Sequence, residues 1–202
     1  MSRRLIHIEN MTIGHGKRAL YENVTFDIHA GDCIMLCGAN GSGKTTLLKA
    51  IADMKEAECK VRMIPSRIPK VKGFSVKDFV KVSCFRQTDM SGRLSDHDKA
   101  CLDQALAGLG ITDLQDRDIS TLSDGEFQKA CIAAALVQHA GIILLDEPTA
   151  FLDIPTRFEI CRLLADLAHS SGKTIIFSTH DIDAALPVCD NFAILDNAIL
   201  TL

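Results

Sequence analysis

The chain has 202 residues, of which 47% are hydrophobic and 5% aromatic, and its formal net charge is −4. This length and apolar content suffice for one globular domain with a sizeable, mostly aliphatic core. The negative charge argues against a general nucleic-acid-binding protein. No apolar run approaches the roughly 20 residues that span a bilayer, and the first residues lead directly into a strand pattern. We therefore expect no signal peptide and a cytoplasmic location.

Basic residues are concentrated in the window 60–81, which holds seven Lys or Arg residues and one Asp. The window carries a charge of +6 and leaves −10 for the rest of the chain. Such a window is compatible with a solvated face and equally with a face that meets an acidic partner.

The eight cysteines are scattered along the chain, and none forms a Cys-x-x-Cys pair. Cysteine is among the residue types that are most often buried, where it acts as a small hydrophobic side chain. We therefore interpret these residues as buried thiols and not as a metal site.

Apolar patterns in the first third of the chain predict short strands around a glycine-rich loop and one helix. Alternating apolar residues predict two strands joined by a glycine-containing turn, and a continuous apolar run predicts a buried strand. The expected elements are strands over 5–9, 24–28, 33–37 and 61–64, with a helix over about 44–53.

The segment between the buried strand and this helix reads Gly38-Ala39-Asn40-Gly41-Ser42-Gly43-Lys44-Thr45 and fits the pattern GxxxxGK[ST]. Its glycines let backbone N–H groups surround phosphate oxygens, and the positive end of the helix faces the same anion. Lys44 is expected to reach the β- and γ-phosphates, and the Thr45 hydroxyl to bind Mg²⁺. The predicted nucleotide-binding residues are Gly38, Asn40, Gly41, Ser42, Gly43, Lys44, Thr45 and Thr46.

The middle of the chain, 75–120, has several helical patterns, including 98–109, and no convincing strand. A further helix is predicted over about 123–139, because Ser123 and Glu126 have the spacing of a capping box. The remaining elements are expected to be strands over 142–145 and 174–178, helices over 155–170 and 181–188, and a hairpin of 192–195 with 199–202. Alternating strands and helices predict an α/β fold with a largely parallel sheet covered on both faces.

Two carboxylates, Asp146 and Glu147, follow the apolar strand 142–145. Asp146 is expected to coordinate Mg²⁺, through water, since a hard cation takes oxygen ligands. Glu147 is expected to polarise or deprotonate the attacking water. Taken alone, the pair is typical of the solvated end of a strand, but the preceding phosphate loop favours a catalytic role.

With these motifs in order, the chain resembles the ATP-binding subunits of ABC transporters from about Leu5 to Leu202. Three segments carry the resemblance. Leu122-Ser123-Asp124-Gly125-Glu126 is similar to the LSGGQ signature, Ala150-Phe151-Leu152-Asp153 to the D-loop, and Ser178-Thr179-His180-Asp181 to the switch-histidine segment. The resemblance implies a P-loop NTPase cassette over 1–202, with a RecA-like, mostly parallel core sheet, an antiparallel β subdomain and a helical signature subdomain. The expected subdomains are 1–32 (antiparallel β), 33–68 with 140–202 (nucleotide-binding core) and 69–139 (helical).

The resemblance also implies roles for single residues. Catalysis is expected from Glu147, His180 and Lys44, with Asp153 in the D-loop. Metal contacts are expected from Thr45, Asp146 and Ser66. In the family two subunits dimerise head to tail, so the signature residues would act on the ATP of a partner copy; these residues are Ser123, Asp124, Gly125 and Glu126.

A narrower likeness is to the subunits that import metal chelates such as iron-siderophore complexes, haem and cobalamin. The segments that carry it are Ser123–Lys129, Glu147–Asp153 and Phe74–Val80. The implied partners are a second copy of the chain, an integral membrane permease and an extracytoplasmic substrate-binding protein, with no nucleic acid. The implied cofactors are ATP and Mg²⁺, and the implied location is the inner face of the cell membrane, through the permease.

Two positions depart from the family pattern. Ser66 stands where the family usually has a glutamine beside the metal, and a serine hydroxyl has a shorter reach. His15 aligns with the aromatic residue that stacks on adenine, and Tyr21 is the alternative for that role. Other functions compatible with the motifs are a soluble ABC ATPase outside transport, for example in cluster assembly, and a regulatory nucleotide-binding module with weak hydrolysis. A small P-loop kinase would not need the signature segment.

Overall fold

The computed structural model describes residues 3–15, 18–54, 57, 59–83, 94–196 and 199–201. The chain forms two compact units, one made of Met1–Ser66 with Gly141–Leu202 and the other of Arg67–Ala140. Among the described residues, no helix combines the length and apolarity that a membrane crossing requires.

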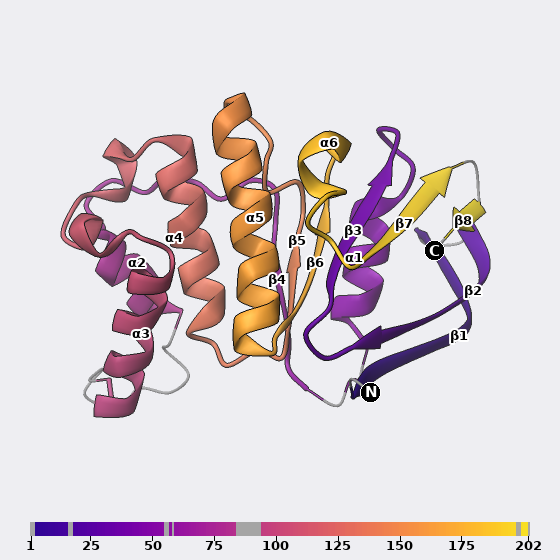
Figure 1. The fold of residues 1–202 in the computed structure, drawn as a ribbon, viewed down its shortest axis with the longest axis horizontal. Coiled ribbons are helices and arrows are strands. Elements are labelled where there is room, and N and C mark those ends of the chain that lie inside the picture. Colours follow the sequence, from indigo (N-terminus) through magenta and orange to yellow (C-terminus); the bar gives the residue numbers. More distant parts are fainter. Residues whose placement is uncertain are drawn as a thin grey trace. The chain divides into compact units, whose positions relative to one another are not determined.

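A six-stranded sheet with the order β4-β5-β6-β3-β7-β8 forms the centre of the larger unit (Figure 1). Its strands β3, β5 and β6 are almost entirely buried, as expected for parallel strands covered on both faces. Five strands run parallel, and β8 pairs antiparallel with β7. The bounds are β3 Cys33–Gly38, β4 Val61–Ile64, β5 Ile142–Leu145, β6 Thr174–Ser178, β7 Asn191–Asp196 and β8 Ile199–Thr201.

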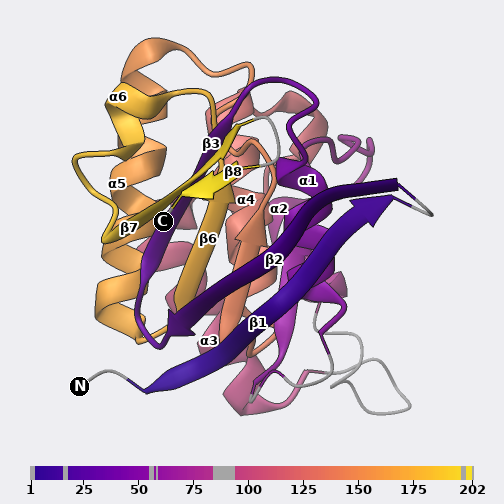
Figure 2. The ribbon, with the colours of Figure 1, turned by 90° about the vertical axis from the view of Figure 1, so that its right-hand side faces the viewer.

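Helices cover both faces of this sheet, with α1 on one side and α5 and α6 on the other (Figure 2). The helix α1 (Lys44–Ala52) buries its apolar stripe in the core, with Leu48 and Ile51 completely inaccessible. The helix α5 (Ile154–Ser171) begins with proline in its first turn, and α6 (Ile182–Ala185) is a single turn. The predicted α/β fold with a mostly parallel sheet is confirmed, and the helix expected over 181–188 is shorter.

An antiparallel hairpin of β1 (Arg4–His15) and β2 (Arg18–His29) forms a second sheet. Both strands are longer than the expected 5–9 and 24–28. Asn10 and Asn23, where the two predicted strands stop short, have left-handed backbone angles (φ 49° and 57°). A shift in strand register also falls between Ile8 and Met11. Such a bulge interrupts the alternation of inward and outward side chains from which a strand is recognised.

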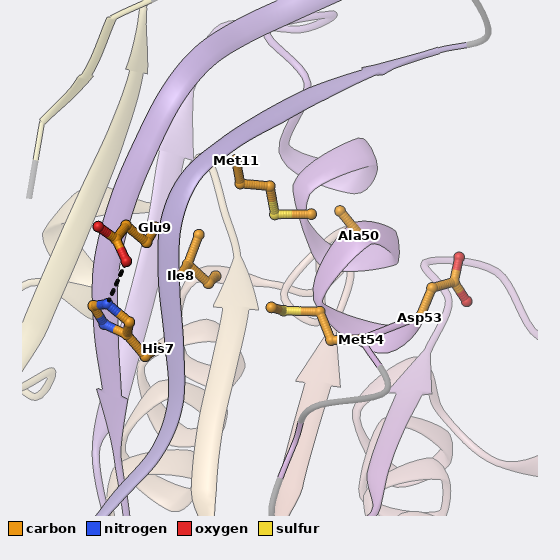
Figure 3. A pocket seen from close by; sticks show the side chains of 7 residues that line it. All are labelled: His7, Ile8, Glu9, Met11, Ala50, Asp53 and Met54. Carbon is orange, nitrogen blue, oxygen red and sulfur yellow. Dashed lines mark ion pairs between the residues drawn. The ribbon is translucent and has the colours of Figure 1, made fainter.

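Beside the hairpin, a pocket of about 590 Å³ lies between β1 and the carboxyl end of α1 (Figure 3). Met11 and Met54 point into it from opposite sides, and His7 and Glu9 form an ion pair at 3.5 Å on its rim. Both methionines pack against the hydrophobic core, so the pocket is a gap in the layer between β1 and α1. It lies at the end of α1 that is remote from the glycine-rich loop.

The second unit is helical, as the patterns over 75–120 predict. Its described part contains α2 Val76–Val82, α3 Asp96–Gly108, the 3₁₀ turns η2 Thr112–Leu114 and η3 Ile119–Thr121, and α4 Asp124–Leu136. Serine caps the start of each α-helix: Ser75, Ser95 and Ser123 each accept a hydrogen bond from the backbone N–H three residues on. The predicted capping box of Ser123 and Glu126 is confirmed, and α4 ends at Leu136 instead of continuing to residue 139.

Candidate functional site

The register of three neighbouring strands brings the predicted motifs to one edge of the sheet. The strand β6 lies between β3 and β5, and all three run parallel. Leu36 pairs with Ser178 and Leu145 with Phe177, so the three carboxyl ends lie side by side. Ligands of open α/β sheets bind at this edge, where strand order reverses.

The glycine-rich loop after β3 leaves donors of α1 without side-chain partners. Gly41 and Gly43 have positive φ values of 81° and 101°, which other residues adopt at a cost. Gly43 is the N-cap of α1 and provides no side-chain hydrogen bond. Among the described residues, Ser42 Oγ is the buried side-chain atom that has no hydrogen-bond partner. Uncapped N–H groups at the positive end of a helix and an unpaired hydroxyl fit an anion such as a phosphate.

Lys44 lies at the centre of the site, with only 6% of its surface accessible. Its Nζ donates to the carbonyl oxygens of Gly38 at 2.9 Å and Ala39 at 3.3 Å. The same atom lies 3.5 Å from Glu147 Oε1 and 3.3 Å from His180 Nε2. A buried ammonium group requires such acceptors, and charged phosphate oxygens are stronger acceptors than carbonyls.

Thr45 and Asp146 face each other across the edge. Thr45 Oγ1 donates to the two carboxylate oxygens of Asp146 at 3.1 and 3.0 Å. The hydroxyl of Ser178, which is fully buried, donates to Asp146 Oδ1 at 2.8 Å. A hydroxyl and a carboxylate held together in this way are oxygen donors of the kind that Mg²⁺ takes beside a nucleotide, so these residues fit that ion.

Glu147 has a left-handed backbone conformation with φ 51°, which is uncommon for a residue with a side chain. Its backbone N–H donates to Ser178 Oγ at 2.8 Å, and its Oε1 lies 2.9 Å from His180 Nε2. Strained backbone of this kind persists where surrounding contacts enforce it, and it is concentrated at functional sites. Ser178 thus fixes both carboxylates, through the side chain of Asp146 and the backbone of Glu147.

A second network, which the sequence patterns did not indicate, supports the loop that carries His180. Thr149 Oγ1 donates to Asp181 Oδ2 at 2.5 Å and lies 3.0 Å from Thr179 Oγ1. Arg157 of α5 donates to the other oxygen of Asp181 at 2.6 Å. Thr149 and Thr179 are fully buried. In the sequence, the available signal for this support is the position of the two threonines next to the predicted residues Glu147 and His180.

Comparison with known proteins identifies the family. The model of the family described as ABC transporter matches residues 21–150. The petrobactin import ATP-binding protein FpuC of Bacillus anthracis is 32% identical, over 95% of this chain and 78% of that protein. The chain belongs to the ABC transporter family. It is an ATP-binding subunit of this family and an ATPase, as the resemblance implied.

Other relatives of this ABC subunit agree. The iron(3+)-hydroxamate import ATP-binding protein FhuC of Bacillus subtilis is 31% identical, over 88% of this chain and 73% of that protein. A chain of a transporter described as metal-chelate type, in an inward-facing conformation, superposes with a TM-score of 0.88 at 27% identity, covering 98% of this chain and 82% of that one. The cassette fold predicted from the sequence is therefore confirmed.

The two residues considered for adenine stacking have different outcomes. The side chain of His15 lies outside the described part of the structure. Tyr21 is 3% exposed, and its hydroxyl donates to the carbonyl oxygen of Ser42. Burial raises the pKa of Tyr21, with a contribution from the nearby charge of Asp196. Tyr21 was therefore the wrong alternative, because its ring supports the phosphate loop from inside the core and cannot stack on a base.

Ser66 is exposed and stands two residues after β4. The carbonyl of Ile64, at the end of that strand, accepts a hydrogen bond from the backbone N–H of Asp146 at 2.9 Å. Ser66 therefore follows the strand that borders the acidic pair. Its role at a metal ion stays a prediction.

In the helical unit of the ABC subunit, the signature segment contains acids where the family pattern has glycine and glutamine. Lys70 Nζ donates to Asp124 Oδ1 and to the carbonyl oxygen of Leu122, both at 2.8 Å. Arg117 lies 3.4 Å from Glu126 Oε1, and hydrogen bonds from Ser123 hold the pKa of Glu126 below its ordinary value. The two acids are thus matched by two cations, and Lys70 of the basic window serves the helical unit itself.

Replacing Lys70 with alanine should lower the free energy of unfolding by about 1–2 kcal/mol. The change removes the hydrogen bond to the carbonyl oxygen of Leu122 and the contact of the ammonium group with the Phe127 ring at 5.4 Å. The exposed pair with Asp124 contributes little. Urea unfolding of the whole chain measures this loss. The control is Lys72→Ala, an exposed position where we expect less than about 0.5 kcal/mol. Equal effects of the two substitutions would show that Lys70 does not hold the signature segment.

The D-loop segment combines a helix cap with exposed apolar side chains. Asp153 is the N-cap of α5 and accepts a hydrogen bond from Thr156 N–H at 3.0 Å. Hydrogen bonds from the side chain and the backbone of Thr156 lower the pKa of this carboxyl. Phe151 and Ile154, on either side of it, are each 69% exposed, and Phe158 follows one turn later at 48%. Clustered exposed apolar residues are typical of a protein–protein interface.

Proposed function

We propose that this ABC subunit hydrolyses ATP at the edge where the strands β3, β5 and β6 end. The observation that carries the proposal is the convergence of two sets of contacts at this edge: Thr45 with Asp146, and Lys44 with both Glu147 and His180. Residues separated by more than a hundred positions in the chain meet there. A site with a cation, oxygen ligands for a metal, a base and a base-orienting imidazole has what phosphoryl transfer to water requires.

Each residue has a distinct part in the proposed reaction. Lys44 and the N–H groups at the start of α1 bind the triphosphate. Thr45 and Asp146 would hold Mg²⁺, which neutralises charge on the phosphates when it is bound. Glu147 accepts the proton of the attacking water. His180, in contact with Glu147 at 2.9 Å, orients that carboxylate and meets the γ-phosphate.

The active form is proposed to be a head-to-tail dimer in which Ser123 and Gly125 of one copy cover the ATP held by the other. The helix α4 is 13 residues long, and its N-terminus at the signature segment offers a second anion site. The exposed Phe151 and Ile154 beside Asp153 supply an apolar surface for the partner copy. ATP would join the two copies, and its hydrolysis would release them.

A mixing experiment tests this arrangement. Lys44→Ala disables the phosphate loop of its own copy, and Ser123→Arg disables the signature segment that the copy lends to its partner. Each variant alone should be inactive, while a mixture should regain about one quarter of the wild-type ATPase rate, since half of its dimers are mixed and each holds one intact site. Continued inactivity of the mixture would show that the signature does not act on the partner's ATP.

The dimer is proposed to attach to a membrane permease on the inner face of the cell membrane and to drive import of a metal chelate, with an extracytoplasmic binding protein delivering the cargo. The support is the likeness to subunits named for petrobactin import and for iron(3+)-hydroxamate import. In cells whose only copy is the Glu147→Gln form, uptake of labelled ferric hydroxamate, haem or cobalamin should fall, while amino-acid uptake stays unchanged. Unchanged uptake of all three chelates would refute this cargo class.

A further inference from the structure

Two histidines and a cysteine meet in the helical unit, away from the residues assigned to ATP. His97 and Cys101 lie one turn apart on α3, and His139 follows the end of α4. One possible ligand atom from each residue lies within 4.8 Å of those of the other two. His97 Nε2 is 3.7 Å from Cys101 Sγ, and the rings of His97 and His139 stack with centroids 5.7 Å apart.

Local structure explains why these side chains converge. Residues at i and i+4 share one face of a helix, so His97 and Cys101 project together from the start of α3. Ser95 caps this helix by a hydrogen bond with the backbone of Asp98. His139 reaches the same place by a left-handed turn with φ 52°, three residues after α4 ends.

We propose that His97, Cys101 and His139 form a binding site for a borderline-soft divalent transition metal of the Zn²⁺ class. A thiolate and two imidazoles are ligands that such ions prefer over Mg²⁺ and Ca²⁺, which take oxygen. In a tetrahedral zinc site the ligand atoms are about 3.5 Å apart. His97 Nε2 and Cys101 Sγ already lie near that spacing, and rotation of the exposed or half-buried side chains can bring all three ligand atoms, which lie within 4.8 Å of one another, to it. Three protein ligands leave a fourth position for water or another ligand.

A carboxylate stands beside the three ligands. Asp98 Oδ1 lies 3.7 Å from His139 Nε2, and Asp98 itself is 6% exposed. Ser95 Oγ donates a hydrogen bond to Asp98 Oδ2 at 2.6 Å and holds this carboxylate in place. A fixed negative charge next to the imidazole favours a bound cation.

A metal at this site would tie the start of α3 to the segment that follows α4. The signature segment lies at the amino end of α4, and the metal would bind beyond the carboxyl end of the same helix. Binding to the folded state alone also stabilises the fold, so the apparent melting temperature should rise with metal concentration. The site does not depend on the proposed ATPase roles.

Cobalt is a suitable probe, because thiolate coordination gives a sulfur-to-Co²⁺ charge-transfer band. Nucleotide-free protein with reduced thiols should bind one equivalent of Co²⁺ with this band, and Zn²⁺ should displace it. Cys101→Ser should abolish the band, while Cys189→Ser, a half-buried cysteine of the other unit, should keep it. The absence of a band from the wild type, or its persistence in Cys101→Ser, would overturn the proposal.

Zinc affinity, measured by competition with a chelating dye, provides the second readout. His139→Ala should weaken Zn²⁺ binding at least about tenfold. The control is His169→Ala, an exposed histidine that contacts Asp190 at 2.9 Å and lies in the other unit. Zn²⁺ should raise the melting temperature of the wild type but not that of Cys101→Ser. The melting transition of Cys101→Ser without metal also shows whether this variant is folded. Equal zinc affinities of the two histidine variants would contradict the site.

Discussion

Replacing Glu147 with glutamine should lower the ATP hydrolysis rate of this ABC subunit by about 10²–10⁴-fold, the usual contribution of a general base. Glutamine keeps the size of the side chain but cannot accept the proton of the attacking water. Nucleotide affinity should change little, because Lys44 and the loop amides that hold the phosphates remain. Phosphate release at saturating MgATP measures the rate, and titration with a fluorescent ATP analogue measures the affinity.

The matched control is Asp166→Asn, the same change of acid to amide at an exposed position on α5. It should keep the wild-type rate. Since Glu147→Gln binds ATP without hydrolysing it, this variant should also double its mass in solution when ATP is added and stay monomeric with ADP. An unchanged hydrolysis rate in Glu147→Gln would show that Glu147 is not the general base. A variant that stays monomeric with ATP would show that ATP does not join the two copies.

Replacing Gly38 with alanine should destabilise the chain by roughly 3 kcal/mol or more and weaken ATP binding about 10–100-fold. A Cβ atom at this position would lie 2.4 Å from the carbonyl oxygen of Leu195 and 2.7 Å from Ser42 Oγ. The first contact is with the backbone of β7, which cannot rotate away. The loop must therefore move, and its N–H groups lose their alignment with the phosphates. Urea unfolding and nucleotide titration measure the two effects.

The control for this substitution is Gly108→Ala at the end of α3, where a Cβ atom would meet no atom within 4 Å. There alanine should stabilise the chain by up to about 1 kcal/mol, because glycine is the poorer helix former. ATP binding by Gly38→Ala at wild-type strength would show that close backbone packing at this glycine is not needed for the loop.

Local patterns in the sequence predicted those elements that depend on neighbours in the chain. The capping box of Ser123 and Glu126 is an interaction over three residues, so its residue types suffice to predict it. The strand 142–145 is a continuous apolar run and needs no partner to be recognised. The hairpin strands were predicted too short, because the bulges near Asn10 and Asn23 depend on pairing between β1 and β2.

Contacts between distant segments could not be predicted from the sequence. Ser178 was noted as part of a motif, but its bonds to Asp146 and Glu147 arise from the pairing of β5 with β6. The cysteines were expected to be buried thiols, and Cys131 and Cys161 are free cysteines in buried positions, as expected. Cys101 instead meets His97 and His139, and the spacing of four between the first two was the signal that could have indicated it.

The sequence by itself determined the family, the α/β class and the identity of the phosphate loop, because motifs of fixed order and local spacing carry that information. The tertiary structure alone decided which side chains touch: Lys44 with Glu147, Thr45 with Asp146, and Tyr21 with the inner side of the loop. The reason is physical. Strand order in a parallel sheet is set by burial of apolar faces, and it places residues side by side without regard to their distance along the chain.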